Sequence, residues 1–362
     1  MRPGGDGLVP EKGSQPMAIE CNESSITQGR ERATPHLTLS SVEHSVVPEG
    51  RALLRTAADT GDTVRAALAD GPLERPHPAS STAILLVSSA DRHGIVAALA
   101  QVLTEHGANI LSADQHRDEH EAQFFQRIRF DVSRLLTDRA TLERSISKVA
   151  CHFEMATRLF YEGSPARVAI FVSHYDHCLC DLLWRHRAGE LECIISLIIA
   201  NRPDLAWVAR QMGVPFFVFP KDPSNKLEQE ARELALLEER GIDLIVLARY
   251  MQVLSGAFIE RYAQRIINIH HSFLPAFSGG KPYHQAARRG VKLVGATAHY
   301  ATEQLDEGPI IEQDVIRATH KDAVGDLTRK GRDVERNVLG RAVRWHLDHR
   351  ILVHGNRTVV FD

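Results

Sequence analysis

The sequence predicts an α/β protein in which a small βαββαβ domain precedes a larger, doubly wound and mostly parallel sheet. Residues 83–161 alternate between strand and helix patterns in the order β-α-β-β-α, with space for a final strand. Beyond residue 166, nearly continuous apolar strands alternate with helical segments, as expected for a parallel sheet buried on both faces. The chain has 362 residues, which is too long for one ordinary compact domain.

The first 78 residues are predicted to be a disordered extension with no catalytic role. Glycine, proline, serine and threonine are frequent there, and apolar periodicity is weak. The pattern at residues 51–68 favours a short helix, and the prolines at 72, 76 and 78 favour an extended linker.

The predicted small domain covers residues 82–162. Its strands are expected at 83–88, 110–115, 124–132 and 157–161, and its helices at 95–106 and 139–153. Gly107 follows the first helix, where a left-handed cap is wanted.

The turns Asp91-Arg92-His93-Gly94-Ile95-Val96 and Gly107-Ala108-Asn109-Ile110 resemble those of the ACT domain, a ferredoxin-like regulatory module. The resemblance implies pairing into a homo-oligomer and a small ligand, often an amino acid, near Asp91, Gly94 and Asn109. Free backbone N–H groups at a helix start attract such a carboxylate. Two alternatives stay open: the module only pairs subunits, or Asp91 is simply a helix cap.

The predicted large domain covers residues 166–362, after the boundary Gly163-Ser164-Pro165. Strands are expected at 167–173, 192–200, 214–219, 242–248, 266–270, 292–300 and 309–315, with helices at 180–187, 205–212, 226–240 and 329–347. A hairpin over 351–361 turns at Gly355-Asn356. In the helix over 226–240, one face is predicted to carry Leu227, Ala231, Leu234 and Leu237.

Composition and charge exclude several classes of partner and cofactor. The formal net charge of −3 gives no basic field for nucleic acid or anionic lipid, and no apolar run is long enough to span a membrane. Five irregularly spaced cysteines favour a reducing compartment, so a cytoplasmic protein without a zinc site is expected. The first βα turn, at residues 173–177, contains no glycine, so no nucleotide cofactor is predicted. His271, His284 and His299 lack helical metal-ligand spacing; no metal is predicted, and hydrogen-bonding support is expected of His284 and His299.

The candidate site begins with Asn268 and His270, two residues apart on one strand. Their side chains share a face and stand roughly 6–7 Å apart, because side chains alternate along a strand. An amide donates to a carbonyl oxygen, an imidazole moves protons, and a carboxylate such as Asp306 orients an imidazole or a water. We expect the three side chains to converge for acyl chemistry without a covalent nucleophile.

The motifs Asn268-x-His270, Ser272-x-Leu274-Pro275 and Leu305-Asp306-x-Gly308-Pro309 are similar to those of the formyltransferase fold family, which uses 10-formyltetrahydrofolate. The resemblance covers residues 167–362. It implies that Asn268 binds the formyl oxygen, His270 handles protons, and Asp306 holds the histidine or a water. The residues that it implies for pterin binding are Met251, Gln252, Val253, Leu254, Thr302 and Leu305.

Two comparisons with the branches of that family indicate which branch this sequence resembles. The Gly-Ser-Gly phosphate loop typical of glycinamide-ribonucleotide formyltransferases is replaced here by Ser173-His174-Tyr175, and the basic C-terminal domain typical of methionyl-tRNA formyltransferases is not seen. An ACT-like module followed by Pro282-Tyr283-His284-Gln285-Ala286 is similar to the hydrolytic branch, in which water takes the formyl group. The resemblance therefore implies a folate substrate, water as co-substrate and no cofactor. Formyl transfer to an amine, and a folate-binding regulatory protein without turnover, remain as alternatives.

Overall fold

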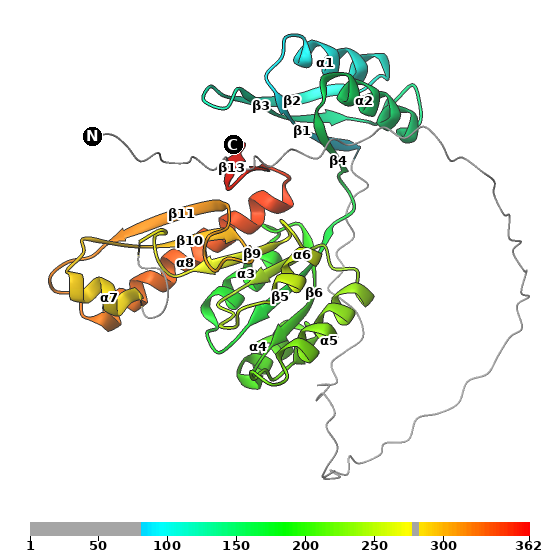
Figure 1. Cartoon of the computed structure of the whole chain (residues 1–362). Helices are drawn as coiled ribbons and strands as arrows, with labels where there is room; N and C mark the ends of the chain where they lie inside the picture. The colour runs from blue at the N-terminus through cyan, green and yellow to red at the C-terminus, as the bar shows by residue number, and fades with distance from the viewer. Residues whose placement is uncertain (1–80, 277–281) are drawn as a thin grey trace, which may run out of the picture. The chain divides into compact units, whose positions relative to one another are not determined.

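The computed structural model describes residues 81–276 and 282–362. Within them lie two sheets and a terminal hairpin (Figure 1). The extension predicted for residues 1–78, with its helix at 51–68 and its prolines, lies outside the described residues.

The first sheet has four strands in the order β2-β3-β1-β4. The elements are β1 (Thr82–Ala90), α1 (Ile95–Glu105), β2 (Asn109–Asp118), β3 (Gln123–Asp131), α2 (Arg139–Phe153) and β4 (Ala156–Tyr161). Both helices cover the same face of this sheet (Figure 1). The predicted βαββαβ order is confirmed.

Helices α1 and α2 begin with different capping residues. Asp138 caps α2 by accepting a hydrogen bond from the Thr141 amide, as its short side chain favours. The residue before α1 is Gly94, at φ 92°, with no side-chain cap. The alternative in which Asp91 caps that helix is wrong, because its carboxylate instead accepts from the Arg117 guanidinium.

The second sheet has seven strands in the order β11-β10-β9-β8-β5-β6-β7. They are β5 (Ala166–Val172), β6 (Cys193–Ala200), β7 (Phe216–Val218), β8 (Leu244–Leu247), β9 (Ile266–His270), β10 (Leu293–Tyr300) and β11 (Ile310–Arg317). Strands β5 to β9 are parallel, β10 is antiparallel to its neighbours β9 and β11, and β11 therefore runs in the same direction as β5 to β9. This confirms a mostly parallel sheet.

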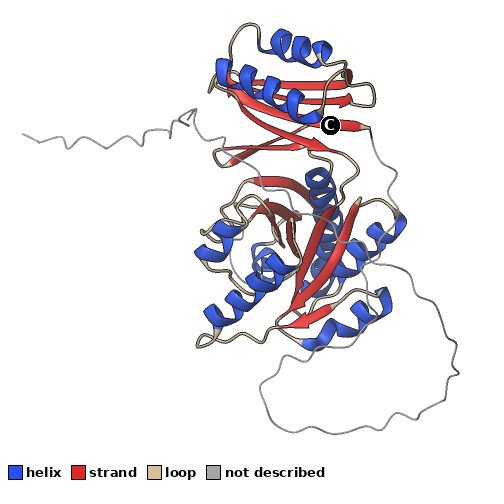
Figure 2. Cartoon of the chain, turned by 90° about the vertical axis from the view of Figure 1, so that its right-hand side faces the viewer, coloured by secondary structure: helices blue, strands red, loops and turns tan. Residues whose placement is uncertain are grey.

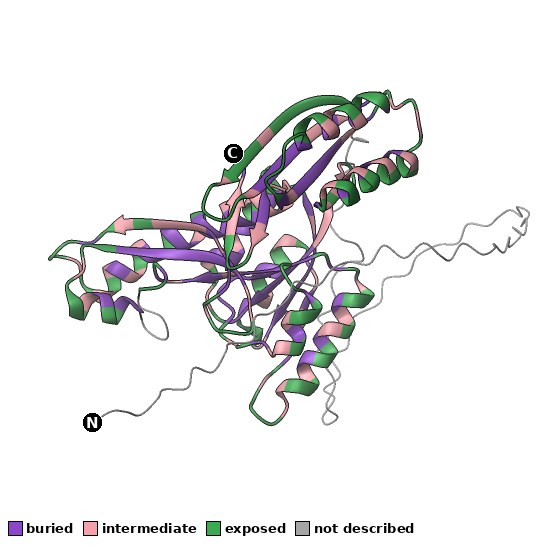
Figure 3. Ribbon diagram, turned by 45° about the horizontal axis from the view of Figure 1, so that its top comes forward, coloured by how far each residue is buried: buried purple, intermediate pink, exposed green. Residues whose placement is uncertain are grey.

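Helices lie on both faces of this sheet, and its central strands are buried (Figures 2 and 3). They are α3 (His177–Ala188), η1 (Pro203–Leu205), α4 (Ala206–Met212), α5 (Lys226–Glu239), α6 (Gly256–Arg261), α7 (Pro282–Arg289) and α8 (Val324–Leu347); the hairpin is β12 (Ile351–His354) with β13 (Arg357–Val360). No helix among the described residues is long and apolar enough to cross a membrane.

Three helix predictions need correction. Helices α6 and α7 were not predicted, because six and eight residues are too short to show a clear period. Helix α8 begins at Val324 rather than 329, where Asp326 accepts from the Ala323 amide and supports the first turn.

The buried face of α5 also differs from the prediction. Leu237 is buried, but Leu227 is 70% exposed, whereas Glu230 and Glu233 are buried. The helix is thus rotated so that two carboxylates face the protein interior.

The strand order reverses beside β5. The chain passes from β5 to β6 and β7 on one side and then continues with β8 on the other. In doubly wound sheets ligands bind beyond the carboxyl ends of the strands at such a point. Here these are the ends of β5, β8 and β9.

Candidate active site

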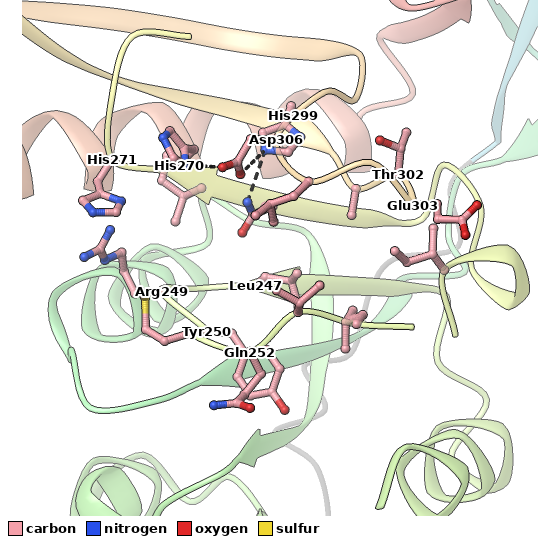
Figure 4. Close-up of a pocket in the computed structure, with 18 residues that line it drawn as sticks. Leu247, Arg249, Tyr250, Gln252, His270, His271, His299, Thr302, Glu303 and Asp306 are labelled. Carbon is pink, nitrogen blue, oxygen red and sulfur yellow. Dashed lines mark hydrogen bonds and ion pairs between the residues drawn. The ribbon is translucent and has the colours of Figure 1, made fainter. Parts of the chain in front are cut away.

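A cavity of about 290 Å³ lies at this edge of the sheet (Figure 4). All nine residues predicted for catalysis and substrate binding line it: Asn268, His270, Asp306, Met251, Gln252, Val253, Leu254, Thr302 and Leu305. The structure therefore brings the predicted set together, while the role of each residue stays a prediction.

Strand register explains the convergence. Leu247 of β8 pairs with Asn268 of β9 in parallel, so both strands end at the cavity. Strand β10 runs antiparallel and places His299 directly opposite Asn268. The turn after β10 then carries Asp306 back over the end of β9 (Figure 4).

His270 and Asp306 form the closest charged contact of the site. The His270 Nδ1 atom lies 3.1 Å from Asp306 Oδ2, and the two side chains are 6% and 9% exposed. The His270 Nε2 atom is buried and has no hydrogen-bond partner among the described residues. With the Nδ1 proton donated to Asp306, Nε2 carries the lone pair and is free to accept a proton from a water.

Asp306 stays ionised across the ordinary pH range. Burial would raise the pKa of its carboxyl, but the imidazoles of His270 and His299 beside it hold that pKa well below its usual range. The contact of Asp306 with His270, at 3.1 Å, is shorter than its contact with His299, whose Nε2 lies 3.7 Å from Oδ1.

His299 orients the Asn268 amide. Its Nδ1 atom lies 3.0 Å from the Tyr300 carbonyl oxygen, which accepts the Nδ1 proton and leaves Nε2 as an acceptor. Asn268 Nδ2 lies 3.2 Å from that Nε2. One amide N–H is thus engaged by His299, and the other remains available to a substrate oxygen.

The turn that carries Asp306 requires unusual backbone geometry. Asp306 itself is left-handed, with φ 61°, which is uncommon outside glycine. A Cβ atom at Gly308 would lie 1.8 Å from the Tyr300 carbonyl oxygen, so only glycine fits there. The turn is therefore built to return the carboxylate to the end of β9.

The loop after β8 supplies four of the predicted substrate-binding residues, and hydrogen bonds to neighbouring elements fix both of its ends. The Met251 amide donates to Ser173 Oγ at 2.9 Å, and Ser173 donates to Asn201. Ser255 starts α6 by accepting from the Phe258 amide, and its own amide donates to Glu230 at 3.3 Å. Both ends of the loop are thus fixed by side chains of other elements.

A fully buried charge cluster supports the same loop. Lys221 Nζ lies 2.7 Å from Glu233 and 3.8 Å from Glu230, and all three side chains are at most 3% exposed. The Tyr250 hydroxyl lies 3.5 Å from Glu233. Burial raises the pKa of Glu233 to about 7, although Lys221 opposes the shift.

Glu233→Gln should flatten the pH dependence of stability. The folded protein binds the Glu233 proton more tightly than the unfolded chain, so this group favours folding at low pH and that contribution is lost as pH rises from about 4.5 to 7. Between pH 5 and pH 8, the unfolding free energy attributable to Glu233 should fall by about 2–3 kcal/mol. Urea unfolding of both proteins at the two pH values measures the difference; equal changes in both would contradict the protonation of a buried Glu233.

Sequence reasoning missed a second buried cluster beside the cavity. Glu335 of α8 accepts from Tyr283 at 2.6 Å and contacts His177 Nε2 at 2.8 Å, and Arg249 Nε lies 3.4 Å away. Burial opposes ionisation of Glu335, but His177 and Arg249 together lower its pKa. Helix periodicity offered no signal for this carboxylate, which falls on the buried face of α8.

Two further predictions concern residues away from these strands. His284 lies exposed on α7 and is not among the residues that line the cavity, so no supporting role is seen for it. In the small domain, Asp91 and Gly94 lie in the turn before α1, and Asn109 opens β2; all three are exposed. An effector site at these residues remains a prediction.

Comparisons with known proteins match this architecture. Family models for a formyl transferase and for an ACT domain match residues 166–343 and 83–146, respectively. A formyltetrahydrofolate deformylase of Synechocystis sp. is 53% identical over 280 residues, covering 77% of this chain and 98% of the relative. The chain belongs to the formyltetrahydrofolate deformylase family.

Solved structures agree with this assignment. A formyltetrahydrofolate deformylase from Pseudomonas syringae superposes with a TM-score of 0.76 at 44% identity, covering 78% of this chain and 94% of that one. A glycinamide ribonucleotide transformylase from Symbiobacterium toebii reaches a TM-score of 0.53 at 31% identity, covering 57% of this chain and 98% of that one. The deformylase family thus accounts for both domains, and the transformylase for a smaller part of the chain.

Proposed function

We propose that the protein hydrolyses 10-formyltetrahydrofolate to formate and tetrahydrofolate. The observation that carries the proposal is the buried His270–Asp306 pair with Asn268 beside it, at the end of one strand and in one cavity. The family to which the chain belongs supports the choice of substrate.

The proposed reaction begins with a water held near His270 Nε2. As the water oxygen bonds to the formyl carbon, Nε2 takes its proton, and Asp306 stabilises the resulting imidazolium. The carbonyl electrons move onto the formyl oxygen, where the free Asn268 N–H donates to the oxyanion. The carbon–N10 bond then breaks, and N10 receives the proton from His270. Formic acid loses its own proton to become formate.

The deciding assay uses the purified protein and 10-formyltetrahydrofolate without any amine. We expect formate and tetrahydrofolate to appear in equal amounts. Turnover that required an added amine would instead select formyl transfer, and substrate binding without product would select a regulatory folate-binding protein.

The proposal extends to cofactors and partners. The residues at the cavity supply the base, the acid and the oxyanion donor, so the proposed hydrolysis needs no metal or nucleotide, and full activity after chelator treatment is expected. The ACT domain suggests a homo-oligomer and a small effector such as an amino acid. The products would serve one-carbon and purine metabolism, and the free thiols of Cys178, Cys180 and Cys193 favour the reducing cytoplasm.

A further inference from the structure

Arg249 is the only lysine or arginine among the described residues that line the cavity. Its side chain is only 7% exposed. Its Nε atom lies 3.4 Å from Glu335, beyond a good hydrogen bond, and its guanidinium carbon lies 4.9 Å from the centre of the Tyr175 ring. Among the described residues, no oxygen accepts a hydrogen bond from this guanidinium. Its Nε–H is thus directed to an ion pair with Glu335, and the four N–H groups of the two terminal nitrogens have no hydrogen-bond acceptor among the described residues.

The backbone places this guanidinium next to the reacting centre. Leu247 at the end of β8 pairs with Asn268, so Arg249 and His270, each two residues further along the chain, lie at the same edge of the sheet and line one cavity. The Arg249 φ of 61° is left-handed, a conformation that glycine adopts more readily than arginine. An arginine at such a position, held by Glu335 and Tyr175, indicates a functional demand for its side chain.

Other polar atoms near Arg249 are also unpaired. Figure 4 shows the Arg249 guanidinium directed toward His271, whose ring nitrogens have no hydrogen bond to a described residue. His270 Nε2 is likewise buried and unpaired. The Arg249 cation and the neutral His271 imidazole therefore lack a hydrogen-bond acceptor among the described residues, and His270 Nε2 lacks a donor.

We propose that Arg249, assisted by His271, is the binding site for the formate that the reaction releases. This inference rests on the proposed hydrolysis. A carboxylate presents two oxygens to the fork of an arginine, and the paired charge-assisted bonds are stronger than those between neutral groups. When the carbon–N10 bond breaks, the new carboxylate is released beside His270, within the cavity that Arg249 lines. Transfer to Arg249 draws formate away from the imidazole and frees the site for the next water.

The carboxylates of the folate tail could also bind an arginine, but the burial of the Arg249 guanidinium argues against them as its ligand. The guanidinium is almost fully enclosed and lies beside the strand that carries Asn268 and His270, where the formyl group is proposed to react. The tail is separated from that group by an aromatic ring. The small anion formed at the reacting carbon is therefore the better occupant.

Product inhibition tests the assignment. Sodium formate is titrated into the hydrolysis assay of the wild type, Arg249→Lys and Arg249→Met, with Arg185→Met as a control. Arg185 also pairs with carboxylates, Asp181 and Glu190, but lies on α3 away from the cavity lining. We expect the inhibition constant for formate to rise about tenfold in Arg249→Lys, which keeps the charge but not the fork, and about a hundredfold in Arg249→Met. Arg185→Met should match the wild type.

Two further arms separate the possible failures. Carbon-13 formate titrated into the folded proteins and observed by NMR measures binding without turnover, so it tests this site even if the hydrolysis proposal is wrong. A substrate without the glutamate tail shows whether Arg249 binds the tail: a KM increase in Arg249→Lys confined to the tailed substrate would overturn the assignment. Formate binding and inhibition unchanged in either Arg249 variant would also overturn it.

Discussion

Asp306→Asn should lower kcat for formate release by about 10³- to 10⁴-fold while leaving the fold intact. The asparagine fills the same space, but it removes the charge that accepts the His270 Nδ1 proton at 3.1 Å. His270 is then free to adopt the other tautomer, with its Nε2 proton pointing at the water that it should deprotonate. The imidazolium formed during attack also loses its counterion. Single-turnover formate release, measured beside the thermal unfolding midpoint, gives both effects.

A matched control is available on β11. Asp314 also has a lowered pKa, because of its hydrogen bond from Arg341, but it does not line the cavity. Asp314→Asn should therefore leave kcat within about twofold of the wild type, since surface pairs contribute little. If Asp306→Asn retained most of its activity, the proposed role of the carboxylate in holding His270 would be wrong.

Local rules were sufficient to predict most of the site. Alternation along a strand puts Asn268 and His270 on one face whatever the rest of the fold does. A buried parallel strand reads as a continuous apolar run, so β5, β6, β8 and β9 were predictable, and parallel strands end at the same edge of a sheet. The turn with Asp306 was predicted through the family motif, and register then explains its place.

The buried charges were not predictable by these rules. Glu230, Glu233 and Glu335 each fall on a helix, where an acidic residue ordinarily marks the solvent face. Their burial depends on partners that lie outside their own helix: Lys221 for the first two, and His177, Arg249 and Tyr283 for the third. A charge is buried only when such partners are present, and periodicity carries no information about them.

The role of Arg249 was likewise not predictable from the local sequence pattern. The sequence places it in the loop after β8, but nothing in the local pattern distinguishes it from a solvated arginine. Its left-handed φ and its place against Glu335 and Tyr175 emerge only from the fold.

Asn268→Ala should lower kcat by about 10²- to 10³-fold and change KM by less than about threefold. The free N–H of Asn268 is worth most when negative charge develops on the formyl oxygen, so its loss affects the transition state more than the bound substrate. His299 Nε2, which accepts the other N–H at 3.2 Å, is left without that donor, but His299 keeps its bond to the Tyr300 carbonyl. Steady-state kinetics of the variant separate kcat from KM.

The test of Asn268 compares the change in kcat with the change in KM, and does not rely on loss of activity alone. Asn337→Ala, on the exposed side of α8, is the control and should leave both constants unchanged. Should Asn268→Ala raise KM and preserve kcat, the amide would serve ground-state binding only, and the oxyanion would need another donor. If kcat falls alone, the donor acts where the charge develops, and the orientation of the amide by His299 becomes part of the chemistry, since His299 determines which N–H remains free.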